Sequence, residues 1–176
     1  MRIDTDSWGE FPIRELFTVV KGSRLTKAER VEGAFRYIGA TMFNNGITQH
    51  IGNKEHIHPG NVLTVCYNGP VGTTFYQDEP FWATDDVNVL YPKFQMNRNR
   101  GLFIAPIIQK LGAKYAYTNK WKLEDMMASI LRLPVTSEGQ PYWEYIDAYM
   151  EDHIDQADQR IASLYQILGP CKKTLQ

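Results

Sequence analysis

Two groups of histidines and carboxylates are the residues whose types and spacing would suit metal chemistry. They lie in the first half of the chain: His50, Glu55, His56 and His58, and then Glu79, Asp85 and Asp86. Imidazole nitrogens bind zinc, and clustered carboxylates hold divalent cations for hydrolysis. The histidine spacing matches no zinc signature, and no lysine follows the acidic pair at a nuclease-like spacing. We therefore favour surface histidines and a turn between strands over a metal centre.

The sequence shows none of the motifs on which common enzyme mechanisms depend. It has no glycine-rich loop that would hold a phosphate, no nucleophile elbow, and no glycine-rich motif of the methyltransferase kind. Its two cysteines, Cys66 and Cys171, lie far apart and match neither a zinc nor a redox spacing. We predict a chain without catalytic residues, cofactor or metal, in which Cys66 belongs to the core.

A further set of polar residues suits nucleic acid better than catalysis. Asn, Gln and Arg side chains match base edges in the major groove, whereas Lys, Ser, Thr and Tyr hold phosphates. The predicted DNA-contacting residues are Lys21, Arg24, Lys27, Asn44, Asn45, Thr73, Thr74, Lys93, Gln95, Asn97, Arg98, Lys120 and Trp121. Ordinary polar loops explain each of these segments equally well, and Asn44-Asn45-Gly46 is also typical of a tight turn.

The charge distribution is compatible with DNA binding but does not require it. The net charge is -1, and from Glu138 onward three basic residues stand against seven acidic ones. The preceding part of the chain carries 16 basic and 13 acidic residues. The body is therefore mildly basic and the tail is acidic, which leaves DNA as one candidate ligand among several.

The elements that would position these side chains form a mixed α/β body over residues 1–134. The hydrophobic periods predict a short helix that turns into a strand over residues 13–20, and helices over 101–111 and 123–127. Strands are expected over residues 35–38, 62–67, 71–76, 81–84 and 87–91, with a hairpin between the second and third. No apolar run approaches the roughly 18 residues that span a bilayer. Since no signal peptide opens the chain, we expect a cytoplasmic protein without a membrane partner.

A long helix over residues 142–168 is the clearest element of the sequence. Its apolar side chains recur with a heptad spacing, interrupted by Asp147, at Trp143, Met150, Ile154, Ala157, Ile161, Leu164 and Leu168. The loop-like segment 135–141 predicts a boundary before it, between a domain of residues 1–136 and a linker and helix of residues 137–176. Either the helix folds back on the body or it pairs with another helix. Pairing is favoured because a helix of about 40 Å outreaches a body with a radius of gyration of about 14 Å.

The order of these pieces resembles the specificity subunits of type I restriction-modification systems over almost the whole chain. Each motif is weak alone, but their order and spacing are fairly specific. The resembling segments are Trp8-Gly9-Glu10, Tyr37-Ile38-Gly39-Ala40-Thr41 before Asn44-Asn45-Gly46, Asn68-Gly69 with Val71-Gly72-Thr73-Thr74, Lys114-Tyr115-Ala116-Tyr117, and Leu133-Pro134-Val135 followed by Gly139 and Trp143-Glu144-Tyr145-Ile146.

The resemblance implies a non-catalytic α/β (α+β) target-recognition domain with a mixed, partly antiparallel sheet, followed by one coiled-coil-type helix. Such a domain reads double-stranded DNA for methyltransferase and restriction subunits. Family subunits normally hold two recognition domains and two antiparallel helices that set the distance between half-sites. A single copy fits a half-subunit, a subunit of a related system or a shortened chain, and implies a homodimer through the helix. A metal-dependent nuclease using Asp85, Asp86 and a histidine, and a helix-pairing adaptor without DNA binding, remain alternatives.

Overall fold

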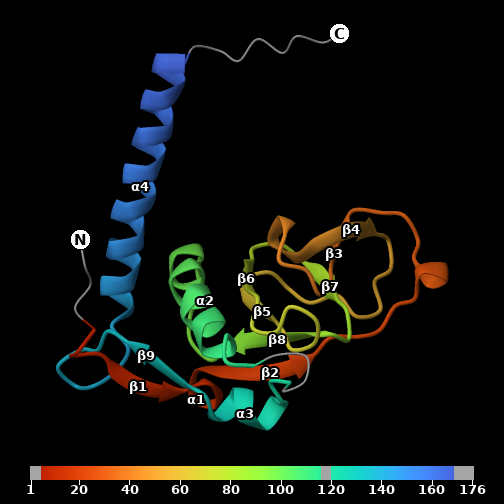
Figure 1. Cartoon of the computed structure of the whole chain (residues 1–176), viewed down its shortest axis with the longest axis horizontal. Coiled ribbons are helices and arrows are strands. Elements are labelled where there is room, and N and C mark those ends of the chain that lie inside the picture. Colours follow the sequence, from red (N-terminus) through yellow and green to blue (C-terminus); the bar gives the residue numbers. More distant parts are fainter. Residues whose placement is uncertain (1–4, 116–119, 169–176) are drawn as a thin grey trace.

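The computed structural model describes residues 5–115 and 120–168. A mixed α/β body carries one long helix that projects away from it (Figure 1). The strands are β1 (Gly9–Pro12), β2 (Phe17–Lys21), β3 (Phe35–Ile38), β4 (Ile47–Ile51), β5 (Val62–Cys66), β6 (Thr74–Gln77), β7 (Phe81–Ala83), β8 (Val87–Pro92) and β9 (Ile130–Leu133). The helices are α1 (Ile13–Leu16), α2 (Arg98–Gly112), α3 (Leu123–Ala128) and α4 (Trp143–Leu168), with 3-10 turns η1 (Lys27–Glu29) and η2 (Asn44–Gly46).

Three small sheets build the body. The largest has the order β2-β8-β5-β6 and is antiparallel throughout, with Leu63 of β5 opposite Leu90 of β8 and Tyr76 of β6. The second has the order β4-β3-β7, in which β3 pairs antiparallel with β4 and parallel with β7. The third pairs β1 with β9 and so joins the start of the chain to its last strand. The predicted mixed, partly antiparallel architecture is confirmed.

Helix α2 covers the four-stranded sheet and supplies much of the core. Phe103, Ile104 and Ile108 of α2 are buried in one cluster with Leu63 and Leu90 of the sheet. The close approach depends on glycine, because a Cβ on Gly101 would lie only 2.3 Å from the Tyr76 ring. Glycine at this position lets the helix lie directly on the sheet, although glycine inside a helix costs about 1 kcal/mol relative to alanine.

Helix α4 confirms the predicted long helix but divides it into two parts with different surroundings. In its first two turns Ile146 is buried in the core of the body, with Trp143 and Met150 packed against the same cluster. Trp143 and Met150 were predicted to lie in a seam that faces a second helix, and the structure corrects this, since they pack on their own chain. Beyond them Ala157, Ile161 and Leu164 are exposed. The outer part of α4 therefore keeps an uncovered apolar stripe.

Within residues 5–115 and 120–168, no helix combines the length and the apolar character that are needed to cross a bilayer. The buried Cys66 belongs to the core, as predicted, and burial raises the pKa of its thiol to about 11. Cys171 lies outside the described residues.

Candidate nucleic-acid interface

Tertiary structure brings the predicted Lys21 and Lys120 to one surface pocket of about 260 Å³. The pocket, called here the lysine pocket, is lined by Lys21, Tyr67, Asn88, Lys120, Lys122 and Leu123. The antiparallel register of β2 and β8 places Lys21 opposite Asn88. The Asn88 amide also donates to Met126 Sδ of α3 at 3.7 Å, which places α3 beside this end of the sheet. Three lysines, an asparagine and a tyrosine from four segments of the chain thus line one pocket.

The charge on Lys21 is stabilised by its surroundings. Its Nζ lies 5.4 Å from the centre of the Tyr67 ring, and hydrogen bonding with Tyr67 is the main cause that raises the pKa of Lys21. The Tyr67 hydroxyl donates in turn to the backbone oxygen of Asp85 at 2.6 Å. Lys21 therefore stays cationic at neutral pH, as an ammonium group that contacts a phosphate must.

Two further predicted cations, Arg24 and Lys27, are exposed on the loop between β2 and β3. The loop is ordered by a capping box, in which Thr26 donates its backbone N–H to the Glu29 carboxylate at 2.9 Å. The hydrogen bonds from Thr26 lower the pKa of Glu29, and this carboxylate interacts with the charge of Arg24. The loop offers two cations on a fixed backbone.

The two predicted asparagines of the Asn44–Gly46 turn differ in exposure, since Asn45 is half-buried and Asn44 is exposed. Asn44 and Asn45 have φ values of 51° and 52°, in the left-handed region that asparagine tolerates. The Asn45 side chain donates to the Tyr76 backbone oxygen at 3.1 Å and to Gln77 Oε1 at 3.3 Å, while Gln77 Nε2 donates back to the Asn45 oxygen at 3.0 Å. Asn45 thus closes the turn onto β6. Asn44 donates its amide to the Ile47 oxygen at 3.0 Å but is exposed, beside Phe43, which is 73% exposed.

Three of the predicted DNA-contacting residues are core residues, which corrects the sequence-based prediction. Thr73 and Thr74 are buried, and the Thr74 hydroxyl donates to the Gly72 oxygen at 2.8 Å. Trp121 is 0% exposed, stacks on Tyr115 with ring centres 5.4 Å apart, and donates Nε1–H to Ser129 Oγ at 3.3 Å. None of these side chains lies on a surface that a duplex can reach.

The segment from Lys93 to Arg98 serves mainly to begin α2. Asn97 is the N-cap of this helix and accepts the Arg100 N–H at 2.9 Å, while its amide donates to Asp147 of α4 at 3.0 Å. Asn97 was predicted to read a base, and the structure corrects this because both ends of its side chain are bonded within the chain. The Lys93 Nζ donates to the Arg14 oxygen at 2.8 Å, while Gln95 and Arg98 are exposed.

The histidines and carboxylates do not assemble into one site. His58, expected on the surface, is buried: its Nδ1 lies 2.5 Å from the Tyr91 hydroxyl, and burial lowers its pKa. Glu79 is bound to Arg36 at 2.9 Å. Among the residues that the structure describes, no group of three or more His, Cys, Asp or Glu side chains is arranged to hold a metal ion.

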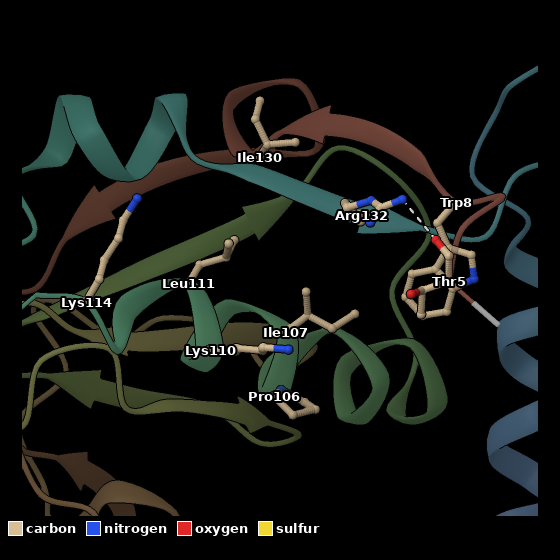
Figure 2. Close-up of a pocket in the computed structure, with 9 residues that line it drawn as sticks. All are labelled: Thr5, Trp8, Pro106, Ile107, Lys110, Leu111, Lys114, Ile130 and Arg132. Atoms are coloured by element: carbon tan, nitrogen blue, oxygen red, sulfur yellow. Dashed lines mark hydrogen bonds between the residues drawn. The ribbon is translucent and has the colours of Figure 1, made fainter. Parts of the chain in front are cut away.

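A larger hollow of about 580 Å³ between α2 and the β1–β9 sheet was not predicted from sequence (Figure 2). Its lining is mostly apolar, and its cations are Lys110, Lys114 and Arg132. The Arg132 guanidinium donates to the Thr5 oxygen at 2.9 Å. Lys122 and Tyr67 of the lysine pocket were also missed. Lys122 carries a sequence signal, since it is a second lysine two positions after Lys120, whereas Tyr67 becomes visible only through the fold.

The fold and sequence are similar to those of known restriction-modification proteins. Residues 5–166 match the family described as the type I restriction modification DNA specificity domain. The specificity subunit S.BcgI of a type II restriction enzyme from Heyndrickxia coagulans is 38% identical over 145 residues, which cover 82% of this chain and 42% of that subunit.

Two solved structures have the same fold. The type I restriction-modification S subunit from M. genitalium superimposes with a TM-score of 0.62 at 19% identity, covering 92% of this chain and 44% of that one. The HsdS subunit from Thermoanaerobacter tengcongensis gives a TM-score of 0.61 at 16% identity, with 97% and 42% covered. The chain therefore spans less than half the length of the relatives that it matches.

Proposed function

The chain belongs to the family of type I restriction modification DNA specificity domains, and from this we propose that it recognises a short sequence of double-stranded DNA. The family match over residues 5–166 is the observation that carries the proposal. The lysine pocket supports it, because three lysines gathered at one surface can neutralise phosphates and release the counterions condensed on DNA. Exposed Asn44, Gln95 and Arg98 offer the side-chain types that match base edges.

We further propose that this chain selects the DNA sequence and that partner subunits carry out the catalysis. A methyltransferase subunit, and in a complete system a restriction subunit, would act on the DNA that the chain selects in the cytoplasm. In this proposal residues 1–136 read the DNA, whereas residues 137–176 link recognition units. The exposed stripe of Ala157, Ile161 and Leu164 on α4 supports pairing with a second copy.

The proposal is tested by duplex selection and by the salt dependence of binding. The wild-type chain is expected to enrich one sequence from a random duplex pool. Lys122→Ala and Arg24→Ala should weaken binding to every duplex alike and reduce the slope of log affinity against log salt by about 1 each, as expected for single phosphate contacts. Fluorescence anisotropy between low and moderate ionic strength measures both effects. Binding that does not depend on salt would contradict the phosphate assignment.

Sequence reading by the Asn44 turn gives a separate prediction. Asn44→Ala should reduce discrimination between the selected duplex and a random one by about 1–3 kcal/mol, because a good amide–base pair contributes this much. Its affinity for random duplex should stay close to wild type, since no phosphate contact is removed. An equal loss of affinity for both duplexes, measured in the same anisotropy assay, would show that Asn44 does not read a base.

A further inference from the structure

A polar cluster joins the root of α4 to the beginning of α2. The Arg100 guanidinium donates twice from Nε to the Asp147 carboxylate, at 3.1 Å and 3.0 Å, and once from Nη2 to Oδ2 at 2.6 Å. Asn97 donates its amide to Oδ1 of the same carboxylate at 3.0 Å, and Asn99 donates to the Asp147 backbone oxygen at 3.1 Å. These residues, together with Trp143, are called here the α4 anchor.

The charged side chains of the α4 anchor are largely shielded from water, and their hydrogen bonds fix their relative orientation. The side chains of Arg100 and Asp147 are only 13% and 27% exposed, so water screens their attraction less than it would on an open surface. The remaining Arg100 Nη1 donates to the Gln95 oxygen at 2.6 Å, which uses every nitrogen of the guanidinium. A planar fork held at all three nitrogens fixes both the position and the orientation of its carboxylate partner.

Aromatic contacts on both sides of Asp147 make the attachment rigid. Trp143 stacks on Phe94 with ring centres 4.1 Å apart and planes at 15°, and it also lies 5.5 Å from the Arg100 guanidinium. Two residues beyond Asp147, Tyr149 meets Phe103 edge-on with ring centres 6.0 Å apart. The root of α4 is thus held over about two turns, by aromatic packing at each end and ionic bonding between.

The outer part of α4 takes its direction from this root. The α4 side chains that pack on the core end at Met150. From Glu151 to Ile167 they are exposed, apart from the half-buried Ile154. Helix α4 runs about 30 Å from Asp147 to its end. A tilt of about 10° at the root therefore moves the far end by about 5 Å, more than one base-pair step of about 3.4 Å.

We propose that the Asp147 carboxylate, held by Arg100 and Asn97, fixes the direction in which α4 leaves the body, and thereby sets the spacing between the two DNA sequences read by a pair of chains. The second half of this statement rests on the proposed function, whereas the first half does not. Asp147 is a positioning residue, because it acts through α4 and touches no DNA in this scheme. Its polar position within an otherwise apolar heptad series is accounted for by this role.

Spin-label distances test the direction of α4 without any DNA. Cysteines are introduced at Lys54 on the body and at Gln159 on the outer part of α4, both exposed, in a chain carrying Cys171→Ser. Cys66 can remain, because it is buried and its pKa of about 11 leaves little reactive thiolate. Labelled chains are mixed with excess unlabelled chains so that distances within one chain dominate.

Wild type and the matched control Asp155→Ala, an exposed carboxylate on the same helix, should give one narrow distance distribution. Asp147→Ala and Arg100→Lys should broaden or shift it, and Asp147→Asn, which keeps an acceptor for Asn97, should give an intermediate distribution. Far-UV circular dichroism verifies that each variant keeps its helix content. A distribution for Asp147→Ala that matches wild type overturns the proposal.

Duplex selection tests the consequence for spacing. Wild type should enrich two half-sites at one spacing, whereas Asp147→Ala should enrich the same half-sites at several neighbouring spacings. An unchanged single spacing for Asp147→Ala would overturn the spacing role even if the label distances change. Failure of wild type to select any duplex would overturn the proposed function and the spacing role with it, while the label distances would still decide whether the anchor directs α4.

Discussion

Replacing Ile161 and Leu164 with aspartate is expected to convert a dimeric chain into a monomer at tens of micromolar. Ile161 and Leu164 are 50% and 55% exposed, although both belong to the apolar series of α4. Each large apolar side chain contributes roughly 1.5–3 kcal/mol when it is fully buried. A second α4 packed antiparallel would cover both, and would bring acids near the start of one helix close to Arg160 of the other. Two buried carboxylates at these positions would cost more than the pairing gains.

Size-exclusion chromatography with light scattering measures the change. The matched control is Gln159→Asp with Gln166→Asp, which adds the same charge at two exposed positions on the opposite face of α4. This control should remain dimeric. A wild-type chain that is monomeric at tens of micromolar, or an Ile161→Asp/Leu164→Asp chain that stays dimeric, would rule out the α4 stripe as the interface. A two-fold dimer would in addition require an interrupted palindrome as its target.

The sequence predicts those elements whose hydrophobic pattern is local and continuous. Strands β5, β7 and β8 and helix α4 lie within one residue of where the patterns place them, since each is bounded by turn residues or by a glycine or proline. Strand β6 begins at Thr74 and not at Val71 as predicted. By contrast, β1 and β9 have four residues each and pair across most of the chain, as Gly9 does with Leu133. Their stability comes from partners that no local window contains, so periodicity alone does not reveal them.

The sequence predicts which residue types could contact DNA, but not which of these residues the fold exposes on one surface. Thr73 and Thr74 have the chemistry of phosphate ligands, yet both are buried at the beginning of β6, a strand that contacts α2 and the η2 turn. Conversely, nothing in the sequence links Lys21 to Lys122, because they meet only where α3 packs beside Asn88, the residue opposite Lys21 in the sheet. Asp147 looked like an interruption of the apolar series, and its role depends on Arg100, far away in the chain.

Truncating Trp121 is expected to give the largest change in stability, and this change distinguishes a core role of Trp121 from a DNA-contacting role. Trp121→Ala should lower the free energy of unfolding by about 3–5 kcal/mol, because truncating a buried tryptophan leaves a cavity. The ring fills the space beside the end of α2, where a Cβ on Gly112 would lie 2.8 Å from it. For a chain of this length the loss corresponds to a fall in Tm of about 6–20 °C.

Lys122→Ala is the matched control for Trp121→Ala, since Lys122 is exposed and lies in the lysine pocket beside it. Its free energy of unfolding should change by less than about 0.5 kcal/mol, while its affinity for every duplex falls. Differential scanning calorimetry and anisotropy on both variants therefore give opposite patterns. A Trp121→Ala chain that keeps the wild-type Tm but loses DNA binding would return Trp121 to the interface. The expected pattern instead assigns phosphate binding to the lysines of the pocket. Trp121 then stabilises the core of the body beside that pocket.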